Sequence, residues 1–139
     1  MNMLWALALT LGCVAGAEDL RHNRVPNWIN ASALGAALLF ATLSRGPAGL
    51  AQAAAGAAVG FGIFLVFYWA GAIGGGDIKL MAAFGGLLGP KGILVAALLA
   101  AIIGALLSAA CLAWNRHSRA IPYAPSIVMG AWLALLGKG

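Results

Sequence analysis

Residues 50–88 read LAQAAAGAAVGFGIFLVFYWAGAIGGGDIKLMAAFGGLL, and their only charged residues are Asp77 and Lys79. A helix that crosses a membrane needs about 20 predominantly apolar residues, and the run 50–72 supplies them. Three glycines at 74–76 then separate this run from a shorter apolar run at 77–88. The stretch predicts a membrane helix, a glycine-rich turn, and a short helix that either crosses or forms a half-helix shielded by protein.

The composition of the whole chain indicates the same surroundings. Of its 139 residues, 63% are hydrophobic and only 8% are charged, and the mean hydropathy is +0.98. A soluble domain carries roughly 25% charged residues, so these few charges cannot cover a water-facing surface. We predict an all-α, polytopic integral membrane bundle in a lipid bilayer, with one domain spanning residues 1–139.

Charges and turn residues divide the chain into about six predicted transmembrane helices. Their approximate bounds are 1–17, 28–43, 50–72, 77–88, 92–114 and 122–136. The first run resembles a signal peptide, but no Lys or Arg precedes it, so we interpret it as a retained helix. Aromatic residues near the helix ends are expected to be interfacial anchors, namely Trp28, Tyr68, Trp69, Trp114 and Trp132.

The net charge of +5 comes from basic residues scattered between apolar runs, which is typical of membrane topology signals and not of nucleic-acid binding. With the N-terminus outside, the cytoplasmic side holds Arg21, Arg24, Lys79, Arg116 and Arg119, and the outer side holds Arg45, Lys91 and Lys138. This excess predicts a multi-pass protein of the plasma (inner) membrane. Asp19 and Asp77 then lie on the same, cytoplasmic side.

The chain has three acidic residues, Glu18, Asp19 and Asp77. Two neighbouring carboxylates can share one proton, so that one acts as a base toward water and the other as an acid toward a carbonyl. Glu18 points about 100° away from Asp19 on a helix, so the predicted catalytic pair is Asp19 and Asp77. No metal site and no cofactor are expected, because Cys13 and Cys111 lie inside apolar runs without ligand spacing.

Each aspartate also has a simpler interpretation. Asp77 can cap the helix that follows the glycines, where the helix dipole favours a carboxylate. Asp19 can be a helix-end charge that pairs with Arg21 or Arg24. Asn27 can cap the second helix, and Lys79 can be a loop residue that sets topology.

Two motifs together make the catalytic interpretation more specific. Asp19 is followed by a basic stretch and by Pro26-Asn27, and Asp77 lies in Gly74-Gly75-Gly76-Asp77-Ile78-Lys79. With a proline-containing start to the last helix at 121–125, the chain resembles the prepilin peptidases, which are membrane aspartic proteases of the Gly-x-Gly-Asp type. The segment before Asp19 matches a short form, without the cysteine-rich insertion that accompanies N-methylation in larger members.

The resemblance implies an aspartic endopeptidase that removes the short basic leader of type IV prepilins or pseudopilins at the cytoplasmic membrane face. Supporting or substrate-binding residues would be Gly74, Gly76, Lys79, Arg21 and Asn27. Two other functions stay open. A small transporter or channel component would use the aspartates as a proton or cation relay, and a non-catalytic scaffold would tolerate Asp→Asn changes at both positions.

Overall fold

The computed structural model describes residues 2–22, 27–71, 73–114 and 124–138, and the regular structure in these ranges is entirely helical. The helices are α1 (Asn2–His22), α2 (Asn27–Trp69), α3 (Gly75–Ala113) and α4 (Ala124–Lys138). The all-α prediction is therefore confirmed for the described chain.

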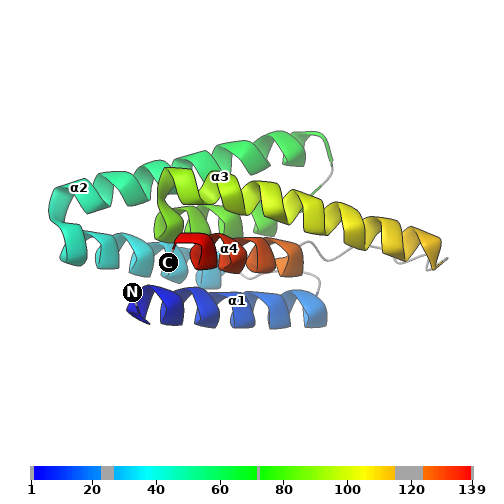
Figure 1. The fold of residues 1–139 in the computed structure, drawn as a ribbon, viewed down its shortest axis with the longest axis horizontal. Helices are drawn as coiled ribbons and strands as arrows, with labels where there is room; N and C mark the ends of the chain where they lie inside the picture. The colour runs from blue at the N-terminus through cyan, green and yellow to red at the C-terminus, as the bar shows by residue number, and fades with distance from the viewer. Residues whose placement is uncertain (1, 23–26, 72, 115–123, 139) are drawn as a thin grey trace.

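The described chain has four helices where the sequence predicted about six, because two predicted boundaries are breaks inside a helix. Gly46 in α2 has φ 62° and ψ −150°, and Gly89 in α3 has φ 74° and ψ 176°. Positive φ suits glycine because it has no Cβ, and the proline after each glycine starts the next turn without needing a hydrogen-bonded N–H. Both long helices double back at these points (Figure 1).

The first helix is longer than predicted. We expected it to end at Ala17, before the acidic pair, but α1 continues to His22. Helices tolerate charged residues well, and basic residues in a last turn interact favourably with the helix dipole. Asp19 and Arg21 therefore belong to the last turn of α1 and not to a loop.

Glycines bring α2 and α3 into close contact. A Cβ on Gly85 would collide with the backbone of Gly56, and a Cβ on Gly60 would lie 2.6 Å from the carbonyl oxygen of Met81. The glycines at 56, 60 and 85 thus allow α2 and α3 to approach closely, as small residues do between membrane helices.

The first half of α3 is the centre of the bundle. Leu80, Met81, Phe84 and Leu88 are all less than 2% exposed, and residues 80–88 are apolar and buried on every side, as expected of a helix surrounded by protein. From Gly75 to the break at Gly89 this segment is about 20 Å long at 1.5 Å per residue. That is shorter than the roughly 30 Å hydrocarbon core of a bilayer.

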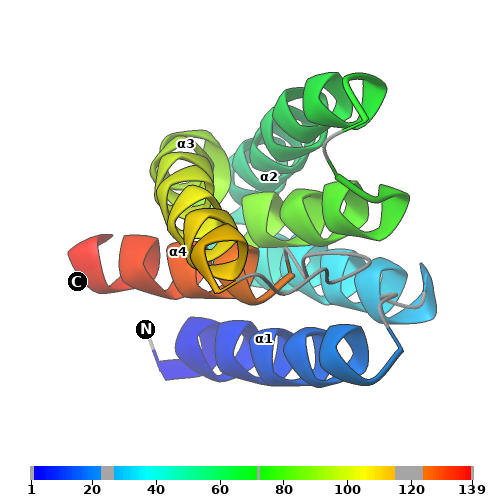
Figure 2. The same cartoon turned by 90° about the vertical axis from the view of Figure 1, so that its right-hand side faces the viewer.

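The first and last helices pack against each other. The indole Nε1–H of Trp132 in α4 donates to the carbonyl oxygen of Ala8 in α1 at 3.0 Å, and Gly12 lies against Trp132 and Val128. Trp132 is therefore part of the contact between α1 and α4, and its role as an interfacial anchor stays a prediction. Figure 2 shows α1 on one side of the molecule, next to α4 and the first half of α2.

The surface is apolar enough for lipid. α2 and α3 are each long and apolar enough to cross a membrane, and two shorter apolar stretches lie at Trp5–Glu18 and Pro125–Gly137. Large apolar side chains are widely exposed, including Leu112 and the three tryptophans Trp28, Trp69 and Trp114. Exposed apolar surface of this extent marks contact with a membrane or a partner.

The helix ends are sorted between the two ends of the bundle. The end of α1, the beginnings of α2, α3 and α4, and the end of α2 lie toward one end, whereas both breaks and the chain termini lie toward the other (Figure 1). The last turn of α1, with Asp19, and the first turn of α3, with Asp77, are therefore at the same end of the molecule.

Candidate active site

Asp77 lies in the first turn of α3, and this helix begins directly after Gly74, whose backbone is extended. Its Oδ2 accepts a hydrogen bond from the Gly74 N–H at 3.3 Å, and its own N–H donates to the Gly74 carbonyl oxygen at 3.2 Å. The amino-terminal end of a helix favours a negative charge. The sequence allowed Asp77 itself to be the N-cap, but the N-cap is Gly74, and Asp77 is the third helical residue, whose carboxylate accepts from the N-cap backbone.

The two sequence motifs are in direct contact. Lys79 Nζ donates to Asn27 Oδ1 at 2.7 Å, across 52 residues of sequence. Asn27 is the first residue of α2, and its side-chain oxygen binds this lysine, whereas the sequence led us to expect a helix cap. The contact joins the segment that follows Asp19 to the turn that carries Asp77.

A second contact joins the same two segments, through a residue that the sequence analysis missed. Asn30 is 3% exposed, and its Nδ2 donates to the carbonyl oxygen of Gly76 at 3.4 Å. Its Oδ1 is buried and has no hydrogen-bond partner among the described residues. A buried amide in an apolar helix is costly unless it is bonded. An amide side chain inside the apolar run 28–43, one turn after Asn27, was the sequence signal that could have identified Asn30.

The structure gives the position of Asp19 in its helix but not the position of its side chain. Asp19 belongs to the last turn of α1, at the Asp77 end of the bundle (Figure 1), and its side chain lies outside the described part of the structure. Arg21 in the same turn is exposed. The residues at 23–26 and at 115–123, which include Arg24, Pro26, Arg116, Arg119 and Tyr123, also lie outside the described ranges.

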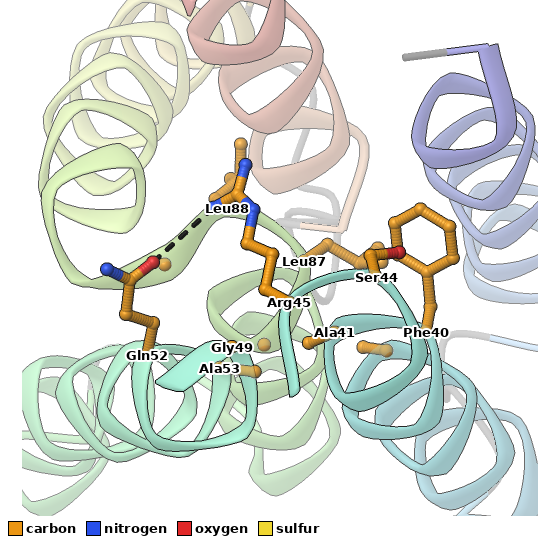
Figure 3. A pocket seen from close by; sticks show the side chains of 12 residues that line it. Phe40, Ala41, Ser44, Arg45, Gly49, Gln52, Ala53, Leu87 and Leu88 are labelled. Atoms are coloured by element: carbon orange, nitrogen blue, oxygen red, sulfur yellow. Dashed lines mark hydrogen bonds between the residues drawn. The ribbon is translucent and has the colours of Figure 1, made fainter. Parts of the chain in front are cut away.

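A polar cavity lies at the opposite end of the bundle, between the two breaks. It has a volume of about 220 Å³ and includes Ser44, Arg45, Gln52 and the α3 backbone near Gly89 in its lining. Figure 3 shows Arg45 extended toward Leu88, with its Nη1 donating to Gln52 Oε1 at 3.4 Å. Leu88 is about 16 Å along the helix from Asp77 at 1.5 Å per residue, so this cavity is separate from the candidate site.

Comparisons with known proteins agree with the motifs. Residues 5–109 match the model of the type IV leader peptidase family. The chain is 33% identical to a prepilin leader peptidase/N-methyltransferase of Aeromonas hydrophila over 143 aligned residues, which cover 96% of this chain and 49% of the relative. It is 37% identical to a protein of that description from Bacillus subtilis (strain 168), over 92% of this chain and 53% of the relative.

A more distant relative has a similar description. The type 4 prepilin-like proteins leader peptide-processing enzyme of Escherichia coli O78:H11 is 30% identical over 91% of this chain and 50% of its own length. No solved structure matches the chain. The chain spans about half the length of these curated relatives. The family match covers most of the chain and includes both aspartate motifs, so the chain belongs to the type IV leader peptidase family.

Proposed function

We propose that this protein is a membrane aspartic endopeptidase that removes the short basic leader of a type IV prepilin or related pilin-like precursor, with Asp19 and Asp77 as its catalytic pair. The observation that carries the proposal is the contact of Lys79 with Asn27 at 2.7 Å. It joins the motif that follows Asp19 to the motif that contains Asp77. The family and the names of the curated relatives support the choice of substrate.

The proposed reaction needs two carboxyl groups and one water molecule. The ionised carboxylate takes a proton from water, whose oxygen attacks the scissile carbonyl carbon, while the protonated carboxyl group donates a hydrogen bond to the carbonyl oxygen. The carbon–nitrogen bond then breaks, and the departing amine takes the proton that the carboxylate removed from water, which returns the pair to its starting state. The two aspartates titrate as a unit, so the acid and base roles belong to the pair.

The proposed topology has six membrane segments in the inner membrane, because the breaks at Gly46 and Gly89 divide α2 and α3 at the points where the sequence predicted outer loops. Arg45, Lys91 and Lys138 then lie at the outer face. The Asp77 end of the bundle faces the cytoplasm, where more of the basic residues lie.

Processing of a precursor tests the proposal. We would co-express the protein with an epitope-tagged type IV prepilin in a host that has no prepilin peptidase of its own. The precursor should shift to the mature size on a gel, and mass spectrometry should find a single cut between the basic leader and the apolar segment. Processing should persist in membranes treated with a chelator. An uncut precursor in membranes that contain the folded protein would contradict the proposed function.

Asn30 is expected to support the reaction from outside the catalytic pair. Asn30→Ala removes the hydrogen bond to the Gly76 carbonyl oxygen, which loosens the turn before Asp77. Because small displacements of catalytic groups can cost up to about 100-fold in rate, we expect kcat to fall about 10- to 100-fold with little change in KM. Ser32→Ala is the control, since the hydrogen bond that Ser32 makes within the described residues is to the Ile29 carbonyl oxygen of its own helix. Equal rates for the two variants would show that Asn30 has no such role.

A further inference from the structure

A large apolar cavity opens at the side of the bundle, between the second halves of α2 and α3 and the first turn of α4. Its volume is about 480 Å³, and its walls include Phe67 of α2, Leu98 of α3 and Ser126 of α4. We call this cavity the lateral groove. It is almost wholly apolar, and its exposed walls include Leu98, which is 63% exposed, and Phe67, which is 46% exposed.

The lateral groove begins at the candidate active site. Ile73, which lines it, directly precedes the Gly74 whose N–H bonds to Asp77. Ser126 lies in the first turn of α4, at the same end of the bundle as the start of α3 (Figure 1). A chain segment cut beside Asp77 could therefore continue directly into this groove.

The α3 wall has the shape that a helix needs for close contact. Ala97, Ala101 and Ala105 all line the groove and are spaced four residues apart, so they lie along one face of α3. Small residues at this spacing allow another membrane helix to approach closely. The stripe alone would be only a packing surface, and the groove needs a second feature to indicate its occupant.

That second feature is the hydroxyl group of Ser126. Ser126 is 1% exposed, it lines the groove, and its Oγ has no hydrogen-bond partner among the described residues. A buried hydroxyl without a partner is unfavourable. The other hydroxyl on the groove wall, Ser108 Oγ, already donates to the Gly104 carbonyl oxygen at 2.8 Å. Among the described residues that line the groove, Ser126 is therefore the one whose hydroxyl is left without a hydrogen bond.

We propose that the lateral groove binds the apolar helix of the precursor next to the cleaved bond, and that Ser126 Oγ hydrogen-bonds to a polar group of that helix. This inference rests on the proposed function. A polypeptide meets both features of the groove, because a helix can pack on the alanine stripe and can offer a carbonyl or polar side chain to the hydroxyl. A lipid acyl chain has no hydrogen-bonding group to offer.

A second apolar cavity, of about 360 Å³ between α1 and the first half of α2, lacks this feature. Thr10, on its wall, donates to the carbonyl oxygen of Ala6 at 2.8 Å, and Ser32 donates to that of Ile29 at 3.0 Å. With both hydroxyls bonded inside their own helices, this cavity resembles an ordinary lipid-facing depression, and it serves as an internal comparison.

Photo-crosslinking tests the occupant. A benzophenone amino acid replaces either Leu98, on the groove, or Leu106, which is 66% exposed on the same helix but outside the groove. Both are made in the Asp77→Asn background, so that the precursor is not consumed. We expect a crosslink from position 98 to the precursor's apolar segment, at least about fivefold stronger than from position 106. Equal yields, or crosslinks from position 98 to lipid alone, would overturn the proposal.

Kinetics test the role of Ser126. Removing one hydrogen bond to the substrate costs about 3- to 10-fold in binding, so Ser126→Ala should raise KM by that factor. Its thermal unfolding temperature in detergent should not fall, because the hydroxyl lacks a partner in the free protein. Ser32→Ala should change neither quantity. An unchanged KM would overturn the proposed hydrogen bond, and a lower unfolding temperature together with a lower kcat would assign Ser126 a structural role.

Filling the groove gives an independent result. Ala101→Leu places a larger side chain on the alanine stripe at an exposed position, and Ala110→Leu places the same side chain on an exposed position of α3 outside the groove. We expect processing at least about tenfold slower in the first variant only. If the unmodified protein cuts the precursor and Ala101→Leu does so equally fast, the groove proposal fails and the proposed function stands. If the unmodified protein does not cut, both fail.

Discussion

Asp77→Asn and Asp19→Asn are each expected to stop precursor processing, with the rate falling at least about 100-fold. Positioned acid and base groups contribute about 10²- to 10⁴-fold to such reactions, and asparagine keeps the shape of the side chain while removing its proton chemistry. Asp77→Asn also retains an oxygen that can accept the Gly74 N–H, so the helix start should survive. The measurement is the rate of conversion of tagged prepilin to its mature form in membranes that contain equal amounts of each variant.

The double variant and the neighbouring acid complete this experiment. Residues that act as a unit have non-additive effects, so Asp19→Asn with Asp77→Asn should be no slower than either single change. Glu18→Gln removes the chain's third acidic side chain, one residue from Asp19, and should process the precursor at near the normal rate. A normal rate in either single aspartate variant would exclude the paired-carboxylate mechanism. Complete loss in Glu18→Gln would instead place Glu18 in the site.

Gly85→Ala is expected to have the largest effect on folding. A Cβ at Gly85 would collide with the Gly56 carbonyl oxygen, which is backbone and cannot rotate away. Overpacking typically costs about 1–3 kcal/mol and sometimes more, so the unfolding temperature in detergent should fall by several degrees. Because Gly85 belongs to the segment that begins with Asp77, the displaced helix should also lose activity.

Gly62→Ala is the matched control for this substitution. Gly62 lies on α2 near Gly56, and an added Cβ there meets nothing within 4 Å. Since alanine in a helix interior is more favourable than glycine by about 0.5–1 kcal/mol, this variant should be as stable as the unmodified protein or slightly more so. If both glycine variants unfold at the same temperature, the close approach of α2 and α3 does not limit stability.

The local pattern around Asp77 predicted a good deal of the candidate site. Three glycines before an aspartate indicated a helix start, and the structure places Asp77 in the first turn of α3. The apolar runs predicted an all-helical chain, which the structure confirms for the described residues, but the predicted bounds differ at the two breaks and at the end of α1. The pairing of Asp19 with Asp77 stays a prediction, supported by the shared end of the bundle.

The remaining features depend on contacts that one-dimensional patterns do not contain. A Gly-Pro pair is compatible both with a loop and with a sharp break, and only the packing of the flanking segments selects the break at Gly46 and Gly89. The extension of α1 to His22 reflects helix propensity in a segment that looked like a loop because it is charged. Ser126 resembles an ordinary helix residue in sequence, and only its burial without a hydrogen-bond partner among the described residues distinguishes it.

The contact of the first helix with the last also sets the order of events during biosynthesis. Trp132 Nε1 and the Ala8 carbonyl oxygen are separated by 124 residues, so at roughly 5–20 residues per second α1 waits about 6–25 s for this partner. During that interval the helix that carries Asp19 lacks one of the surfaces that hold it in place. The packing around the helix that carries Asp19 is therefore completed only after α4 has been made.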